Sequence, residues 1–272
     1  MFRWEIKRSL CIPIIIISVF IGTIFQIAGI YYEYQPKINV IKNIENSEKT
    51  EIDIQITKEF ATESLNSYNG WITGFKYYVL VIILVCVLPY STSYIIDEHS
   101  GFLKYSILKS SRRSAIICKS IVNAIIGGIT TSIPPILSLI IMIKQFTNEV
   151  PSKYMAGYAN FGSFTNYLYG DIWIYILIFI CIFFLIGLTY STFAMAISMI
   201  TKNLVMCILI PQIYWLAGSL LTDTLLTSKL SPWSIFYSFS ERDIFIPGLI
   251  HTLIILIFSV SIIYLKSRED TI

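Results

Sequence analysis

The sequence predicts an all-α membrane protein in which residues 1–272 form one domain of six transmembrane helices. Two observations support this class. Hydrophobic residues make up 55% of the chain and charged residues only 14%, whereas about 25% of a typical soluble domain is charged. In addition, six apolar stretches with uncharged centres reach the roughly 20 residues that a helix needs to cross a bilayer. These stretches cover residues 9–32, 77–96, 115–143, 172–201, 203–222 and 244–265.

The distribution of charge predicts the orientation of the helices. With the N-terminus placed inside, the inner segments carry an excess of basic residues and the outer segments an excess of acidic ones. Cytoplasmic loops carry such an excess of Lys and Arg, so both termini are predicted to be cytoplasmic. The inner basic residues are Arg3, Lys7, Arg8, Lys104, Lys109, Arg112, Arg113, Lys119, Lys202, Lys266 and Arg268.

The N-terminal stretch MFRWEIKRSL resembles the start of a secretory leader, but the apolar run behind it is too long. A leader has an apolar region of about 7 to 15 residues followed by a cleavage site, whereas this run continues to Tyr32. Two interpretations remain. The stretch is either a short amphipathic helix on the cytoplasmic surface, with Arg3, Lys7 and Arg8 facing anionic headgroups, or an ordinary charged flank of the first span.

Two segments outside the spans have distinctive patterns. The extracellular loop 33–76 contains EIDIQIT at residues 51–57, whose strict alternation is the period of a strand. It either pairs with INVIKNI, residues 38–44, in a small β-element or belongs to a flexible loop. Residues 228–243 are too apolar for a free loop and too short to cross. We therefore expect an interfacial or re-entrant segment before the sixth helix.

The third span contains Gly127, Gly128, Pro134 and Pro135 near its middle. Proline removes a backbone hydrogen bond that lipid cannot replace. This span should therefore kink or unwind, and it should pack inside the bundle or face a cavity. The break is interpreted either as a packing feature or as part of a substrate site.

Motifs for chemistry are missing from the sequence. It has no HExxH, GxSxG or GxxxxGK[ST] pattern, so zinc proteolysis, serine hydrolysis and P-loop ATP hydrolysis are not expected of this chain. None of the five cysteines forms a CxxC pair. His251 lies well inside the sixth span, either as a neutral side chain hydrogen-bonded to a neighbouring helix or as a proton relay.

The linker between the second and third spans, IIDEHSGFLKYSILKSSRRS at residues 95–114, concentrates charge in a chain that is otherwise apolar. Its apolar residues do not form a single helical face. This pattern is typical either of a basic loop that sets topology or of a short helix lying between lipid and a protein partner.

The linker resembles the corresponding segment of ABC-2 type transporter permeases. In that family the second span is followed by acidic residues, a Gly-Thr pair, a leucine-rich short helix, a Pro-x-Ser-Arg turn and a Lys entering the third span. Phe102 stands where the family has Thr, and the proline before the Ser-Arg pair is missing. The matching elements here are Asp97, Glu98, Gly101, Leu103, Ile107, Leu108, Ser111, Arg112 and Lys119.

The resemblance implies that the linker is a cytoplasmic coupling helix that docks into a separate ABC ATPase subunit. It implies two ATPase copies, a second permease chain that is identical or related, and a bacterial plasma membrane as the location. ATP and Mg²⁺ would be bound by the ATPase, with no cofactor, metal or nucleic acid held by this chain. The expected coupling residues are Glu98, Gly101, Leu103, Ile107, Leu108, Arg112 and Arg113.

The expected function is export of an amphipathic or hydrophobic substrate, such as an antimicrobial peptide or a lipid-like molecule. The chain itself is not expected to be an enzyme. An ATP-independent secondary transporter or channel is the alternative, and an intramembrane enzyme or sensor is a third class.

Overall fold

The structure is a computed structural model whose regular elements are all helices. Within the described ranges there is no β-strand, and one isolated bridge pairs Asn66 with Thr147. The described residues are 5–8, 13–44, 65–103, 105, 111–147, 164, 167, 170–225, 229, 231–237 and 245–268.

Six of the described helices are long and apolar enough to cross a membrane. The long helices are α2 (Pro13–Ile44), α4 (Ser67–Val87), α7 (Arg112–Gln145), α9 (Ile172–Thr201), α10 (Leu204–Leu225) and α12 (Phe245–Arg268). Two short helices, α5 (Ser93–His99) and α11 (Ser234–Tyr237), lie between them in the chain. The described part of the chain therefore has the architecture of an all-α, multi-pass membrane protein, as the sequence predicts.

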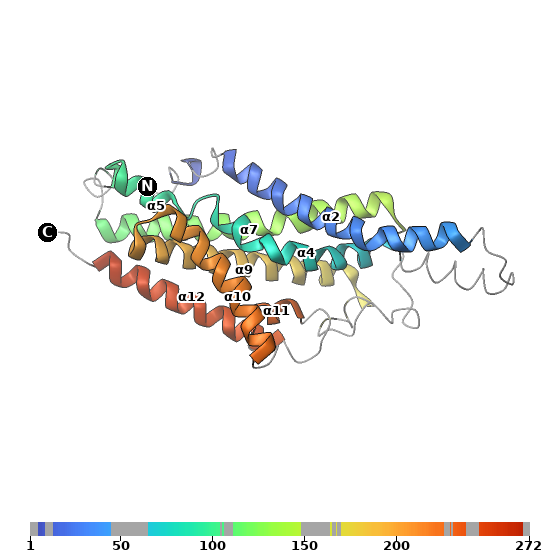
Figure 1. The fold of residues 1–272 in the computed structure, drawn as a ribbon. Coiled ribbons are helices and arrows are strands. Elements are labelled where there is room, and N and C mark those ends of the chain that lie inside the picture. The colour runs from blue at the N-terminus through green and yellow to red at the C-terminus, as the bar shows by residue number, and fades with distance from the viewer. Residues whose placement is uncertain are drawn as a thin grey trace.

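Helices α4, α7 and α9 form the centre of the bundle, and α2, α10 and α12 lie around them. Within their most apolar windows, 67% of the residues of α4 and 61% of those of α7 are buried, against 28% in each of α2, α10 and α12. Figure 1 shows the long helices running side by side, with α2 and α12 at opposite edges of the view. The outer helices expose large apolar side chains, which is the surface that a bilayer requires.

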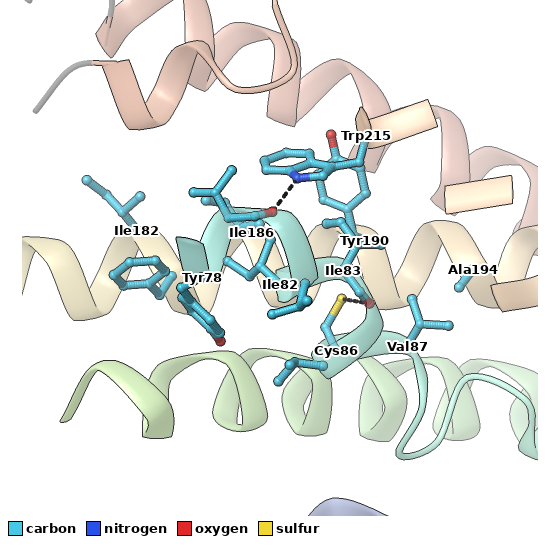
Figure 2. Packing of buried hydrophobic residues seen from close by; sticks show 14 of the residues in the cluster. Tyr78, Ile82, Ile83, Cys86, Val87, Ile182, Ile186, Tyr190, Ala194 and Trp215 are labelled. Carbon is cyan, nitrogen blue, oxygen red and sulfur yellow. Dashed lines mark hydrogen bonds between the residues drawn. The ribbon is translucent and has the colours of Figure 1, made fainter. Parts of the chain in front are cut away.

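The core is built mainly from side chains of α4 and α9, whose aromatic rings lie close together. The Phe75 ring lies 5.5 Å from the Phe179 ring and 4.9 Å from the Phe183 ring, between centroids. Helix α10 joins this core because the Trp215 indole donates a 2.8 Å hydrogen bond to the carbonyl oxygen of Val79. Figure 2 shows Tyr78, Ile82, Ile83 and Cys86 of α4 packed near Ile182, Ile186 and Tyr190 of α9.

Helix α7 continues through Pro134 and Pro135 without unwinding, and at Pro135 a side chain of α4 supplies the missing hydrogen-bond donor. Pro135 has no N–H to donate to the carbonyl oxygen of Thr131 four residues earlier. The Tyr78 hydroxyl donates to that oxygen instead, at 2.8 Å. The Trp71 indole donates to the carbonyl oxygen of Pro135 at 2.7 Å. Of the two packing alternatives expected for this span, burial inside the bundle is the one observed. Of the two expected backbone responses, a kink or unwinding, the helix shows no unwinding.

Small residues bring α7 and α9 into backbone contact. A Cβ atom built on Gly127 would lie 2.7 Å from the carbonyl oxygen of Gly187, and one built on Gly187 would lie 2.8 Å from the carbonyl carbon of Gly127. The Thr131 hydroxyl donates across this crossing to the carbonyl oxygen of Phe183 at 2.9 Å. Small residues with interhelical hydrogen bonds are the usual means of packing helices closely in a membrane.

The helices on either side of the predicted loop 33–76 are longer than the sequence indicated. Helix α2 continues to Ile44, so residues 38–44 are helical and the strand considered for them is wrong. The physical reason is a stripe at helical spacing, in which Ile30, Tyr34 and Ile38 pack beside Met142. The alternating residues 51–57 lie outside the described residues.

The second predicted span, residues 77–96, corresponds to two helices. Helix α4 begins ten residues earlier, at Ser67, and ends at Val87. A turn over residues 88–92 then leads into α5. The break coincides with Pro89, because helices commonly end at or before the residue that precedes a proline.

The described part of the apolar segment 228–243 packs against the bundle instead of forming a free loop. Its short helix α11 buries Ile235 and Phe236. The Phe236 ring lies 5.5 Å from the Phe183 ring and 5.9 Å from the Trp215 ring. A Cβ atom on Gly248 of α12 would lie 2.5 Å from the Ile235 amide nitrogen, so this glycine allows α11 to approach α12 closely.

Candidate functional site

The linker predicted to couple to a partner begins in α5 and ends at the start of α7. Figure 1 shows α5 at the same end of the bundle as both chain termini. Of the expected coupling residues, the structure describes Glu98, Gly101, Leu103, Arg112 and Arg113. The other two, Ile107 and Leu108, lie outside the described residues.

Glu98 ties the linker to the turn between α9 and α10. Its carboxylate accepts a 2.8 Å hydrogen bond from Lys202, whose backbone is left-handed, with φ of 50°, at the end of α9. This hydrogen bond raises the pKa of the Lys202 ammonium group above its usual value. The Lys202 side chain is 62% exposed, so solvent screens the pair and its contribution to stability is under about 1 kcal/mol.

Gly101 and Leu103 set the direction of the linker after α5. Gly101 has φ of +72°, a left-handed conformation that only glycine adopts without strain. The chain can therefore turn at this residue. Leu103 then packs against the hydrophobic core as a partly buried side chain, whereas the Tyr105 side chain two residues later is 63% exposed.

The two arginines at the start of α7 face different neighbours. Arg112 is half-buried and lies beside Tyr94 of α5. The Arg113 guanidinium lies 5.0 Å from the ring centroid of Tyr264 in α12. Both contacts lie within this chain, so the arginines hold the start of α7 against α5 and α12.

A buried ion cluster joins the start of the linker to the N-terminal residues and to α7, and no sequence pattern indicates it. Asp97 is 1% exposed and accepts hydrogen bonds from Arg8, at 2.8 Å for one nitrogen, and from Lys119. Lys119 also lies 3.8 Å from Glu5. The Tyr90 hydroxyl donates to the other oxygen of Glu5. The cluster therefore joins the N-terminal helical residues, the turn before α5, α5 itself and α7.

The charges in this cluster balance, with two carboxylates against one guanidinium and one ammonium. Burying charge is costly unless each group is paired and hydrogen-bonded, and all four groups have such partners. The Arg8 pKa is raised above its usual value, mainly by the hydrogen bond to Asp97. The Arg8 guanidinium also lies 5.1 Å from the Phe102 ring centroid, so it contacts the linker on both sides of Gly101.

The sequence pointed to some members of this cluster for other reasons. Asp97 and Lys119 match a family pattern, and in one of the two interpretations of the N-terminal stretch Arg8 faces lipid headgroups. The structure pairs Arg8 with Asp97 instead. The sequence does not mark Glu5 as a member of the cluster, because a single acid in a basic N-terminal stretch does not show which residues it will pair with.

His251 lies away from the linker, in α12. Its Nε2 atom lies 2.8 Å from the Tyr214 hydroxyl of α10, and the two rings are nearly parallel. The hydrogen bond to a neighbouring helix, which was one interpretation of this residue, is present. Among the described residues there is no group of three or more His, Cys, Asp or Glu side chains placed to hold a metal ion.

The arrangement defines a class of protein at the level of architecture: a multi-pass helical membrane protein with a charged, internally braced linker at one end. No family model, no curated protein and no solved structure matches the chain.

Proposed function

We propose that this chain is the transmembrane permease subunit of an ABC exporter of the ABC-2 type, driven by a separate ATPase. The observation that carries the proposal is that the linker resembling a coupling helix is fixed to the bundle at its first two acids. Asp97 is held by Arg8 and Lys119, and Glu98 by Lys202. A force applied to the linker would therefore reach α7, the α9–α10 turn and the N-terminal helix together.

Such bracing is what a force-transmitting segment requires. A partner shifts a conformational equilibrium only through contacts that differ between the two states. A linker attached by one flexible loop would absorb the movement, whereas one attached through buried ion pairs passes it on. In this proposal Glu98, Gly101, Leu103, Arg112 and Arg113 orient the linker, and exposed residues such as Tyr105 meet the ATPase.

The rest of the proposal concerns assembly and direction. Both termini and the linker lie in the cytoplasm of a bacterial cell, and two permease chains pair with two ATPases that bind ATP and Mg²⁺. The α11 segment then lies on the outer side, as a re-entrant element beside α12. The substrate is an amphipathic or hydrophobic molecule, such as a peptide or a lipid-like compound, that moves outward.

Copurification from the natural host tests the proposal. An ABC ATPase should accompany the tagged wild-type chain and should be lost from Tyr105→Asp and from the Arg112→Glu, Arg113→Glu double variant. Leu103→Asp should also lose it, although this partly buried side chain contributes to packing as well. Lys144→Glu, at the other end of α7, is the matched control and should retain the ATPase. Substrate export that persists after ATP depletion, with no ATPase bound, would support an ATP-independent transporter instead.

A further inference from the structure

The ends of α7 and α12 that lie near the linker place two arginines around one tyrosine. The Arg113 guanidinium lies 5.0 Å, and the Arg268 guanidinium 4.5 Å, from the ring centroid of Tyr264. Arg268 also donates a hydrogen bond to the Tyr264 hydroxyl. All three side chains are exposed.

These two positive charges have no carboxylate partner among the described residues, where the ion pairs involve Arg8, Lys119 and Lys202 instead. A tyrosine ring attracts a guanidinium, but at an exposed site this contributes only about 0.5–1 kcal/mol and does not neutralise the charge. The contrast with the buried ion cluster, where acids and bases balance, is clear. Among the described residues the arginine pair therefore presents two positive charges that are open to an anion.

A groove on α7 begins at Arg113 and becomes apolar along the helix. It is shallow and open, and it is lined first by Ser111, Arg113 and Ser114 and then by Ile117, Cys118 and Ile121. At a rise of about 1.5 Å per residue, it extends roughly 15 Å along α7. The same face continues with further exposed isoleucines, Ile125 and Ile129. A polar head followed by an apolar track along a helix matches a lipid in shape and chemistry.

We propose that this surface binds an anionic phospholipid. Its phosphate lies against Arg113 and the hydroxyls of Ser111 and Ser114, Arg268 adds the second positive charge, and an acyl chain follows Ile117 and Ile121. Guanidinium groups bind phosphate through paired, charge-assisted hydrogen bonds. The proposal needs the helices to lie in a bilayer, but it does not depend on an ATPase partner. It goes beyond coupling because Arg268 is not a member of the linker.

Native mass spectrometry of the purified full chain in detergent, with added phosphatidylglycerol or phosphatidylcholine, tests this site. Wild type should retain phosphatidylglycerol in preference to phosphatidylcholine. Because one basic residue near anionic lipid contributes about fivefold to binding, Arg113→Gln and Arg268→Gln should each lower retention about fivefold, and the double variant roughly twentyfold. Lys144→Gln removes one exposed charge from the far end of α7 and should change nothing.

Four results would overturn the proposal. One is equal retention of both lipids by wild type, and another is a loss in Lys144→Gln as large as in Arg268→Gln. The third is displacement of the lipid by soluble glycerol phosphate at a similar concentration, because the groove would then contribute nothing. If the arginine variants lose a copurifying ATPase but keep phosphatidylglycerol, the arginines belong to a protein interface and the lipid site is wrong.

Discussion

The Tyr78 hydroxyl lies 2.8 Å from the carbonyl oxygen of Thr131 and donates to it. That oxygen is the acceptor that Pro135 leaves without its helical donor. Pro135 can therefore occupy the middle of an apolar helix because a neighbouring helix supplies the missing donor.

Tyr78→Phe should lower stability by about 1 kcal/mol, because it leaves a buried carbonyl oxygen without a donor. In a Pro135→Ala background the helix supplies its own N–H, so the same substitution should cost much less. The measurement is a double-mutant cycle on the unfolding midpoint in mixed detergent. Equal losses in the two backgrounds would show that Tyr78 does not compensate for the proline.

Gly187→Ala should destabilise the chain by about 1–3 kcal/mol, the usual cost of overpacking a core. The added methyl group would collide with the backbone of Gly127 and with the Thr131 side chain. Gly218→Ala is the matched control, since its new Cβ atom would have its nearest neighbour at 3.4 Å. The control should be neutral or up to about 1 kcal/mol more stable, from helix propensity. Thermal unfolding of both variants in detergent compares them directly.

Lys119→Met should cost about 3–5 kcal/mol, because it leaves a buried carboxylate cluster with one cation fewer. Asp97→Asn should also be costly, since it weakens the contacts of both Arg8 and Lys119. The double variant should lose less than the sum of the two. Glu98→Gln, which removes only the exposed pair with Lys202, should change stability by less than about 1 kcal/mol. Strictly additive losses at Asp97 and Lys119 would contradict the direct pairing of these groups.

Cysteine labelling tests the orientation. In a chain whose five natural cysteines are replaced by alanine, Ser100→Cys should react with an impermeant maleimide only after the cells are permeabilised. Thr147→Cys, an exposed position at the other end of α7, should react in intact cells. Labelling of Ser100→Cys in intact cells would place the linker outside and remove the basis for an ATPase partner.

The six long helices could be predicted from composition, because an apolar run long enough to cross a bilayer has few alternatives to a helix. The extension of α2 and α4 beyond the apolar runs could not be predicted in this way. Residues 38–44 and 67–76 are polar enough to resemble a loop, and their helicity depends on packing such as that of Tyr34 beside Met142. Local sequence does not encode that contact.

The same limit applies to the candidate site. The linker could be located from its charge, but the partners of its acids could not, because Arg8 and Asp97, or Lys202 and Glu98, meet only in the folded bundle. Charge spacing within a helix indicates neighbours three or four residues apart. It carries no information on a pair separated by 85 residues, as Glu5 and Tyr90 are.

The dependence of α7 on donors from α4 also bears on how the chain is made. Synthesis proceeds from the N-terminus, so Trp71 and Tyr78 leave the ribosome well before Pro134 and Pro135. A proline-bearing segment that enters the bilayer can thus find its hydrogen-bond donors already in place. In a circularly permuted chain that begins at α7, the prolines would be synthesised before α4. That segment should then either remain at the translocon until α4 follows or be degraded.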